Sequence, residues 1–204
     1  MKKLQTAAAI GLILAIAWGN FASFQEHLQA LHSDVLRLHI LANSDSQEDQ
    51  ALKRMVRDEL LRHSEELFSG GDTPEAMKQR AAKETEAIRR LAQDVLTQQG
   101  CTDSVTVQLV QMDFDERQYE EITMPAGTYD ALRIVIGKGE GHNWWCVMYP
   151  PLCLPAASAE EYFDGETAAI LTQPEQFEVR FRCAELWQQL QEQRTPESPS
   201  QSQR

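Results

Sequence analysis

Basic residues are scarce in this chain and are nowhere gathered into a patch of their own. The 204 residues include 19 Lys and Arg against 31 Asp and Glu, which gives a formal net charge of −12. Beyond the N-terminus, no window concentrates basic side chains without neighbouring acids. Because binding to a phosphate backbone begins with a basic footprint, we predict that nucleic acid is not a partner. The acidic surplus would favour a basic partner, but it is more typical of a solvated surface.

Signatures of cofactor and metal sites are also missing. Gly137, Gly139 and Gly141 form a glycine series like part of a phosphate-binding loop. A dinucleotide site, however, needs such glycines to open a helix, and here they lead into a predicted strand that begins at Trp144. His63, on the apolar stripe of a predicted helix, has no second histidine at metal-ligand spacing beside it. We therefore predict neither a cofactor nor a metal ion.

Hydrolase motifs are absent as well. A thiol hydrolase would need Cys146 or Cys153 as nucleophile and a histidine as base, because an adjacent imidazole generates the thiolate. The histidines considered for that role are His39, His63 and His142. No local cysteine-protease signature surrounds either cysteine. We predict no catalytic residues and a protein that is not an enzyme, and we keep an exported cysteine- and histidine-dependent envelope hydrolase as the alternative function.

The four cysteines, Cys101, Cys146, Cys153 and Cys183, allow three complete disulfide pairings. Cys146 and Cys153 enclose the shortest loop and are our candidate pair, which would stabilise the fold by about 2–3 kcal/mol. The two prolines at 150–151 stiffen the intervening chain, and buried free thiols are a common alternative. The sequence does not decide between these states.

The N-terminus has the pattern of an export segment. Lys2 and Lys3 precede an uncharged stretch, and the first acid is Glu26. A positive end followed by an apolar run predicts a signal peptide or an N-terminal membrane anchor over residues 1–24. Cleavage after Gly19 would place small residues at the required positions, but the uncharged run is also long enough for an uncleaved anchor. Export is predicted, and release is left open.

Residues 34–194 have the length of one domain with one core. Caps and periodicity predict strands at 35–42, 105–109, 129–136, 144–149 and 177–183, and helices at 47–67, 74–99 and 184–194. The order β-α-α-β-β-β-β-α predicts a single α+β domain with a mixed or antiparallel sheet covered by helices. Residues 195–204 form a polar tail that we expect to be disordered.

Three local features stay open at this stage. The first helix is capped either by Ser44 with Gln47 or by Asp45 with Glu48. The glycine-rich joint at 137–143 suits a hairpin or an open loop. Residues 156–173 form either a loop or a short helix.

Four residues are candidates for binding a protein partner. Trp144 and Trp145 are adjacent on a predicted strand and so point to opposite faces, which lets one fill the core while the other meets solvent, a partner or a helix. An exposed tryptophan is a favourable interface anchor, and packing of both rings inside the domain is the equally weighted alternative. Asn43 and Asp45, in the turn before the first helix, complete the candidate set.

Three segments of the chain resemble the stage II sporulation protein R family. They are LRLHILANSDS with DQALK and VRD at 36–58, PAGTYDALRI at 125–134, and NWWCVMYPPLC at 143–153. The resemblance covers about residues 34–187. It implies a protein made in the forespore and exported into the space between forespore and mother cell. There it would trigger a membrane-embedded aspartic protease of the mother cell, which processes a sigma factor precursor. The resemblance implies the signal rather than the protease, and brings no catalytic residues with it.

Overall fold

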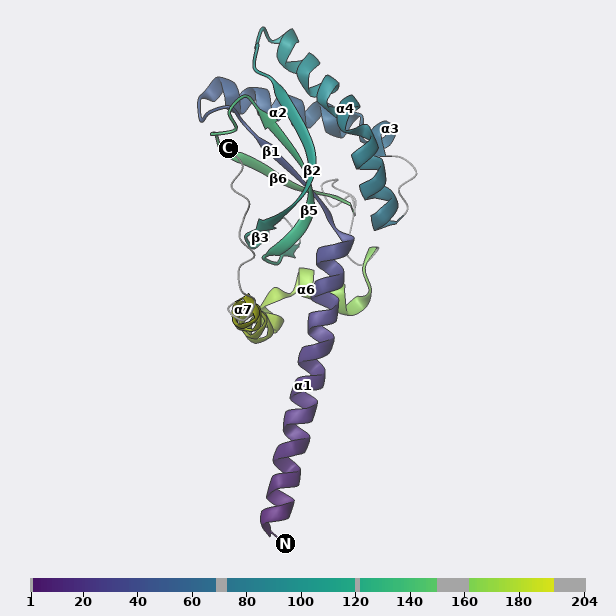
Figure 1. The fold of residues 1–204 in the computed structure, drawn as a ribbon, viewed down its shortest axis with the longest axis vertical. Coiled ribbons are helices and arrows are strands. Elements are labelled where there is room, and N and C mark those ends of the chain that lie inside the picture. The colour runs from purple at the N-terminus through teal and green to yellow at the C-terminus, as the bar shows by residue number, and fades with distance from the viewer. Residues whose placement is uncertain (1, 69–72, 120–121, 150–161, 193–204) are drawn as a thin grey trace.

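The computed structural model describes residues 2–68, 73–119, 122–149 and 162–192 (Figure 1). The elements in chain order are α1 (Lys2–Asp34), β1 (Leu36–Leu41), α2 (Gln47–Arg62), α3 (Ser64–Phe68), α4 (Pro74–Gln98), β2 (Val105–Phe114), β3 (Arg117–Gln118), β4 (Thr123–Met124), β5 (Gly127–Ile136), β6 (Asn143–Tyr149), α6 (Gly165–Thr172), the 3-10 helix η1 (Pro174–Phe177) and α7 (Glu178–Glu192). Figure 1 shows the sheet and its helices at one end of the molecule, with α1 projecting from them as a long rod.

The sheet has four strands in the order β2-β5-β1-β6. β1 runs parallel to β5 and antiparallel to β6, and β2 runs antiparallel to β5. The predicted α+β class with a mixed sheet is therefore confirmed. Because β1 lies between β5 and β6, the glycine-rich joint is an open loop across the end of β1 rather than a hairpin.

One face of the sheet is covered by α2 and α4. Leu38 and Ile40 of β1 pack with Leu132 of β5 against Val56 of α2 and Ile88 of α4. All five side chains are buried, and burying each aliphatic side chain stabilises the fold by about 1.5–3 kcal/mol. This layer is the main core of the domain.

Helix α4 begins and ends as its sequence predicts. The Thr73 side chain accepts a hydrogen bond from the backbone N–H of Ala76 at 3.2 Å, and Pro74 occupies the first turn. Gly100 follows the helix with a φ of 73°, a left-handed conformation that suits glycine after a helix.

The predicted start and length of the first domain helix need correction. Its N-cap is Ser46, whose side chain accepts from the Asp49 N–H at 3.1 Å, and neither Ser44 nor Asp45 takes that role. The Ser44 and Asp45 side chains instead bond to Asp49 and His142. The helix also stops at Arg62, so α3 is a separate turn of helix rather than a continuation.

The opposite face of the sheet is covered by the end of α1 and by α6. Leu31 and Val35 pack against Tyr129 and Ala131 of β5 and Leu171 of α6. A Cβ atom at Gly127 would lie 2.3 Å from the His32 ring, so this glycine lets α1 approach β5 closely.

The predicted strand at 177–183 is wrong, because Phe177 ends the 3-10 helix η1 and residues 178–183 begin helix α7. Phe177 and Phe181 lie four residues apart and both contact Phe24 of α1, with ring centroids 5.9 and 5.2 Å from it. Their spacing fits a helix as well as the alternation fits a strand, and the partner surface on α1 favours the helix.

The segment at 156–173 contains a short helix, α6, which was one of its two predicted states. The Asp164 side chain caps it by accepting from the N–H groups of Glu166 and Thr167. Residues 156–161, the tail at 195–204 and Cys153 lie outside the described residues.

Helix α1 is long and apolar enough to cross a membrane. Its large apolar side chains from Leu4 to Trp18 are between 53% and 77% exposed. The helix is compatible with either a secretion signal or a membrane anchor.

Candidate functional site

The turn after β1 is held by a network of polar side chains. Asn43 Nδ2 donates to Asp49 Oδ2 at 3.1 Å, and the Ser44 hydroxyl donates to the same oxygen at 2.5 Å. The Ser44 hydroxyl lowers the pKa of Asp49, because its hydrogen bond stabilises the carboxylate. Asn43 Oδ1 accepts from the N–H of Lys138 at 3.0 Å, which ties the turn to the loop before β6.

Asp45 and Lys53 make the second connection between the turn and this loop. Asp45 Oδ1 accepts from the His142 N–H at 2.6 Å and also contacts the His142 imidazole. The hydrogen bond from the His142 N–H holds the pKa of Asp45 below its usual value. Lys53 Nζ donates to the His142 carbonyl oxygen at 2.7 Å, and burial lowers the pKa of this lysine. Asn43 and Asp45, the two candidate residues of the turn, therefore position the loop. Their contact with a partner stays a prediction.

The glycine series has a packing role in this loop. Gly137 and Gly139 have φ values of 58° and 66°, in the left-handed region that glycine adopts readily. A Cβ atom at Gly141 would fall 2.2 Å from the Ser44 carbonyl oxygen. The loop then enters β6, so Gly141 serves the close approach of two backbones, whereas Gly137 and Gly139 serve the turn itself.

Trp144 and Trp145 lie on opposite faces of β6, as strand alternation predicts. Trp144 packs against the core under α2, with the Arg57 guanidinium carbon 4.3 Å from its ring centre. Trp145 faces the other way, where its ring stacks on His39 at 4.1 Å and meets Phe114 edge-on at 4.6 Å. Both tryptophans are half-buried.

The face that carries Trp145 also holds a fully buried arginine. Arg37 Nη2 donates to the Tyr119 hydroxyl at 2.7 Å, and its guanidinium carbon lies 4.1 Å from the Phe114 ring centre and 5.1 Å from that of Tyr129. Its Nε and Nη1 atoms have no hydrogen-bond partner, and none of the ion pairs in the described residues involves Arg37. We call Arg37, His39, Phe114, Tyr119, Tyr129 and Trp145 the arginine cage. Aromatic faces take the place of the carboxylate that a buried guanidinium normally has.

Burial makes the histidines of this region neutral. Burial lowers the pKa of His39 to about 4, and the charges of Arg133 and Arg37 lower it further. Burial likewise lowers the pKa of His32 to about 4. A hydrogen bond with the Ala126 backbone raises this pKa, but its effect is smaller than that of burial. Burial also raises the pKa of the Tyr129 hydroxyl. At neutral pH the positive charge of this face therefore comes from its arginines.

Two further arginines border the cage. Arg133 of β5 lies opposite His39 in the strand register, and the Arg117 guanidinium carbon is 5.7 Å from the Trp145 ring centre. Arg117 is exposed and Arg133 is half-buried. Arg117 is therefore the exposed cation of this face, and the exposed acids Asp115 and Glu116 directly precede it in the chain.

The arginine cage was missed from the sequence. The predictions from the sequence include His39 only as a hydrolase base and do not include Arg37. Both residues alternate with Leu36, Leu38 and Ile40 in β1. Two polar residues at alternate positions inside an apolar strand were the available signal for a distinct second face.

A hydrolase site built on β1 and β6 would have to combine His39 with Cys146, and the sheet keeps these two residues apart. The strand register pairs Leu38 with Cys146 and His39 with Trp145, so Cys146 and His39 lie on opposite faces of the sheet. The predicted Cys146–Cys153 disulfide involves a residue outside the described part of the chain. Within the described ranges, no group of three His, Cys, Asp or Glu side chains is arranged to hold a metal ion.

The fold and this site define a small α+β domain carried on an apolar N-terminal helix. A family model described as Stage II sporulation protein R matches residues 32–159. The Stage II sporulation protein R of Bacillus subtilis (strain 168) is 33% identical over 144 residues, which cover 70% of this chain and 64% of that protein. The chain belongs to the stage II sporulation protein R family and therefore has a role in sporulation. No solved structure matches it.

Proposed function

We propose that this protein is an exported signal that activates a membrane-embedded aspartic protease in the neighbouring mother cell. The activated protease then processes a sigma factor precursor. Membership of the stage II sporulation protein R family carries this proposal, and the apolar helix α1 supports the export step. The protein acts in the space between forespore and mother cell by binding the extracytoplasmic part of the protease, and it performs no chemistry itself.

The sheet face around Trp145 is the contact surface that we propose. Trp145 is half-buried, so part of its ring remains available to a partner, and Arg117 beside it is exposed. His39 and Phe114 pack against the inner side of Trp145, and a ring already packed in this way loses less conformational entropy on binding. A tryptophan flanked by arginine is typical of the residues that dominate binding energy at interfaces. The exposed guanidinium of Arg117 would pair with a carboxylate of the protease.

The proposal is tested by producing the protein, the protease and the precursor together in cells that are not sporulating. Wild-type protein should cause the precursor to be processed, and its absence should prevent processing. Arg117→Glu should reduce processing while leaving the melting temperature unchanged, because the residue is exposed. Arg54→Glu is the matched control, since Arg54 is exposed on α2, which covers the opposite face of the sheet.

Two outcomes would count against the proposal in different ways. Failure of the wild-type protein to cause processing, with all three proteins present, would refute the activator role. Normal processing by Arg117→Glu would leave that role intact and place the contact surface elsewhere.

A further inference from the structure

Helix α7 is apolar on two sides, and only one side is covered by the described residues. Its inner side packs Phe181 and Ala184 against α1. Its outer side carries Val179, Leu186 and Trp187, whose side chains are 76%, 60% and 41% exposed, and Trp187, at the edge of this side, also contacts Trp18 of α1. Together with the exposed Cys183 they occupy positions 179, 183, 186 and 187. In a helix with 3.6 residues per turn these positions lie on one side, so they form a stripe along the helix. We call these four residues the outer stripe.

Helix α7 contacts α1 at the level where the outer edge of a bilayer would lie if α1 crossed a membrane. A helix rises about 1.5 Å per residue, so Trp18 lies about 22 Å and Phe24 about 32 Å along the axis from Lys3. The hydrocarbon core of a membrane is about 30 Å thick. If Lys2 and Lys3 lie at the inner surface, as basic residues prefer, the outer boundary falls between Trp18 and Phe24.

Helix α7 contacts α1 at these two levels. Trp187 meets Trp18 edge-on with ring centroids 5.9 Å apart, and Phe181 meets Phe24 at 5.2 Å. The Trp187 side of α7 is therefore nearer the apolar end of α1 than the Phe181 side. Figure 1 shows α7 end-on beside the upright α1, so the two axes cross at a large angle. A helix in this position lies roughly in the plane of the membrane that α1 would cross.

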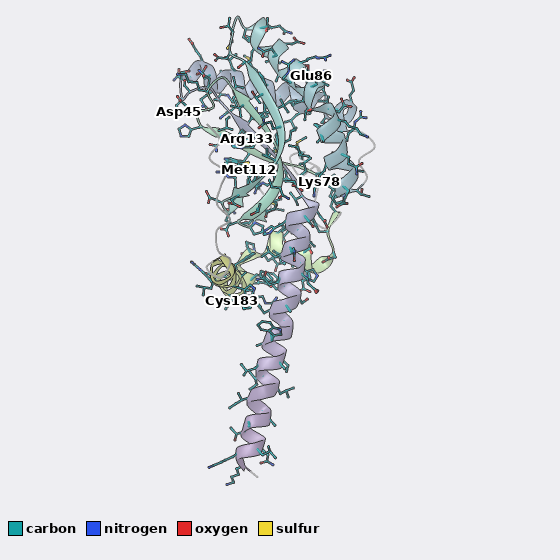
Figure 2. The ribbon with its side chains drawn as sticks, in the orientation of Figure 1. Asp45, Lys78, Glu86, Met112, Arg133 and Cys183 are labelled. Atoms are coloured by element: carbon teal, nitrogen blue, oxygen red, sulfur yellow. The ribbon has the colours of Figure 1, made fainter. Side chains whose placement is uncertain are left out.

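We propose that α1 is retained as an anchor and that α7 is an interfacial helix whose outer stripe lies in the headgroup and acyl boundary of the same bilayer. Trp18 then lies about 8 Å inside the outer boundary of the hydrocarbon core, and Trp187, which contacts it, lies within the depth of about 5–10 Å that the apolar face of an interfacial helix reaches. Exposed Arg182 lies within the same stretch of α7, and its long side chain can reach lipid phosphates. The stripe lies outside residues 32–159, the part matched by the family model, and Figure 2 labels one of its members, Cys183.

This arrangement concerns lipid contact and does not depend on the protease. Two membrane attachments, one crossing and one lying flat, would limit the tilt of the sheet above the membrane. The face that carries Trp145 would then be held at a set height.

The test uses the full chain reconstituted in vesicles of phosphatidylcholine and phosphatidylglycerol. In a Trp18→Phe background, the difference between protein with Trp187 and its Trp187→Phe variant isolates the fluorescence of Trp187. We expect blue-shifted emission, protection from iodide, and stronger quenching by lipids brominated near the headgroup than by lipids brominated deep in the chain. Emission of a water-exposed indole, freely quenched by iodide, would overturn the proposal and point to a protein as the occupant of the stripe.

Introducing negative charge into the outer stripe gives a second test. Val179→Glu with Leu186→Glu should abolish the lipid quenching of Trp187 without lowering the melting temperature of the domain, because both side chains are exposed. Met55→Glu is the control, since Met55 is an exposed apolar residue on α2, away from α1. Unchanged quenching in the double variant would contradict the proposal. So would a protein isolated from sporulating cells whose N-terminus begins after Gly19, because the anchor would then be lost.

Discussion

The imidazole of His39 and the indole of Trp145 lie almost parallel, with ring centroids 4.1 Å apart and planes inclined by 7°. The two residues face each other across β1 and β6 in the strand register. This stack buries the imidazole beside two arginines, which is why its pKa falls to about 4. The same contact therefore supports the inner side of Trp145 and makes the domain sensitive to acid.

Stability should fall between about pH 6.5 and pH 4. His32 and His39 have a pKa of about 4 in the folded protein against an ordinary value of 6.5, so the unfolded chain binds protons more readily in this window. The stability that depends on these neutral histidines is fully present above pH 6.5. By pH 4, protonation of each histidine lowers the free energy of unfolding by up to about 3 kcal/mol. Urea unfolding between pH 7.5 and 4.5 measures it. His39→Phe keeps a ring on Trp145 and should flatten the dependence, and an unchanged slope would contradict this cause.

Both tryptophans of β6 should matter for stability, because both are half-buried on opposite faces. Trp145→Ala removes the stack on His39 and the contact with Phe114, and Trp144→Ala removes packing under α2. We expect each to lower the free energy of unfolding by about 3 kcal/mol, at the lower end of the range for such truncations. Chemical denaturation measures both. A loss for only one variant would mean that the other ring contributes no packing.

Substitutions at Ser46 and Asp45 should distinguish the N-cap of α2 from the neighbouring contact with His142. Ser46→Ala removes the acceptor for the Asp49 N–H and should cost about 1 kcal/mol of stability. Asp45→Ala instead releases the His142 N–H, so hydrogen exchange at that amide should accelerate while α2 stays protected. Asp45→Asn keeps an acceptor and is the control. Loss of protection throughout α2 in Asp45→Ala would show that Asp45 caps the helix after all.

Gly141→Ala should destabilise the domain because the new Cβ would lie 2.2 Å from the Ser44 carbonyl oxygen. Separating the two backbones should cost about 1–3 kcal/mol, as overpacking usually does. Gly165→Ala is the control, since no atom lies within 4 Å of its Cβ position. Thermal unfolding compares the two, and equal melting temperatures would show that the loop moves aside without cost.

Export should depend on the apolar part of α1. Leu12 and Leu14 are 62% and 63% exposed, so replacing both by Asp leaves the core of the domain intact. The charged helix should not partition into the membrane, and the protein should stay inside the cell that makes it. Cell fractionation with an assay of precursor processing measures this, with the Leu12→Ala and Leu14→Ala double variant as control. Normal signalling by the Asp variant would refute export through α1.

The sequence by itself determined those features whose causes are local. Thr73, Pro74 and Gly100 set the ends of α4 through caps and backbone conformation. Alternation set the opposite directions of Trp144 and Trp145, because successive side chains of any strand point to opposite faces. The α+β class followed from the number and order of such segments.

Only the tertiary structure decided which segments became neighbours. The run from Phe177 to Cys183 fits two periodicities, and the aromatic contact with Phe24 made it a helix. The arginine cage joins Arg37 to Tyr119 across 82 residues of chain, in a sheet whose strand order no local pattern states. Burial, and with it the lowered pKa of His39, depends on side chains that the fold brings from other strands. These long-range contacts supply the free energy that chooses between local alternatives of nearly equal propensity.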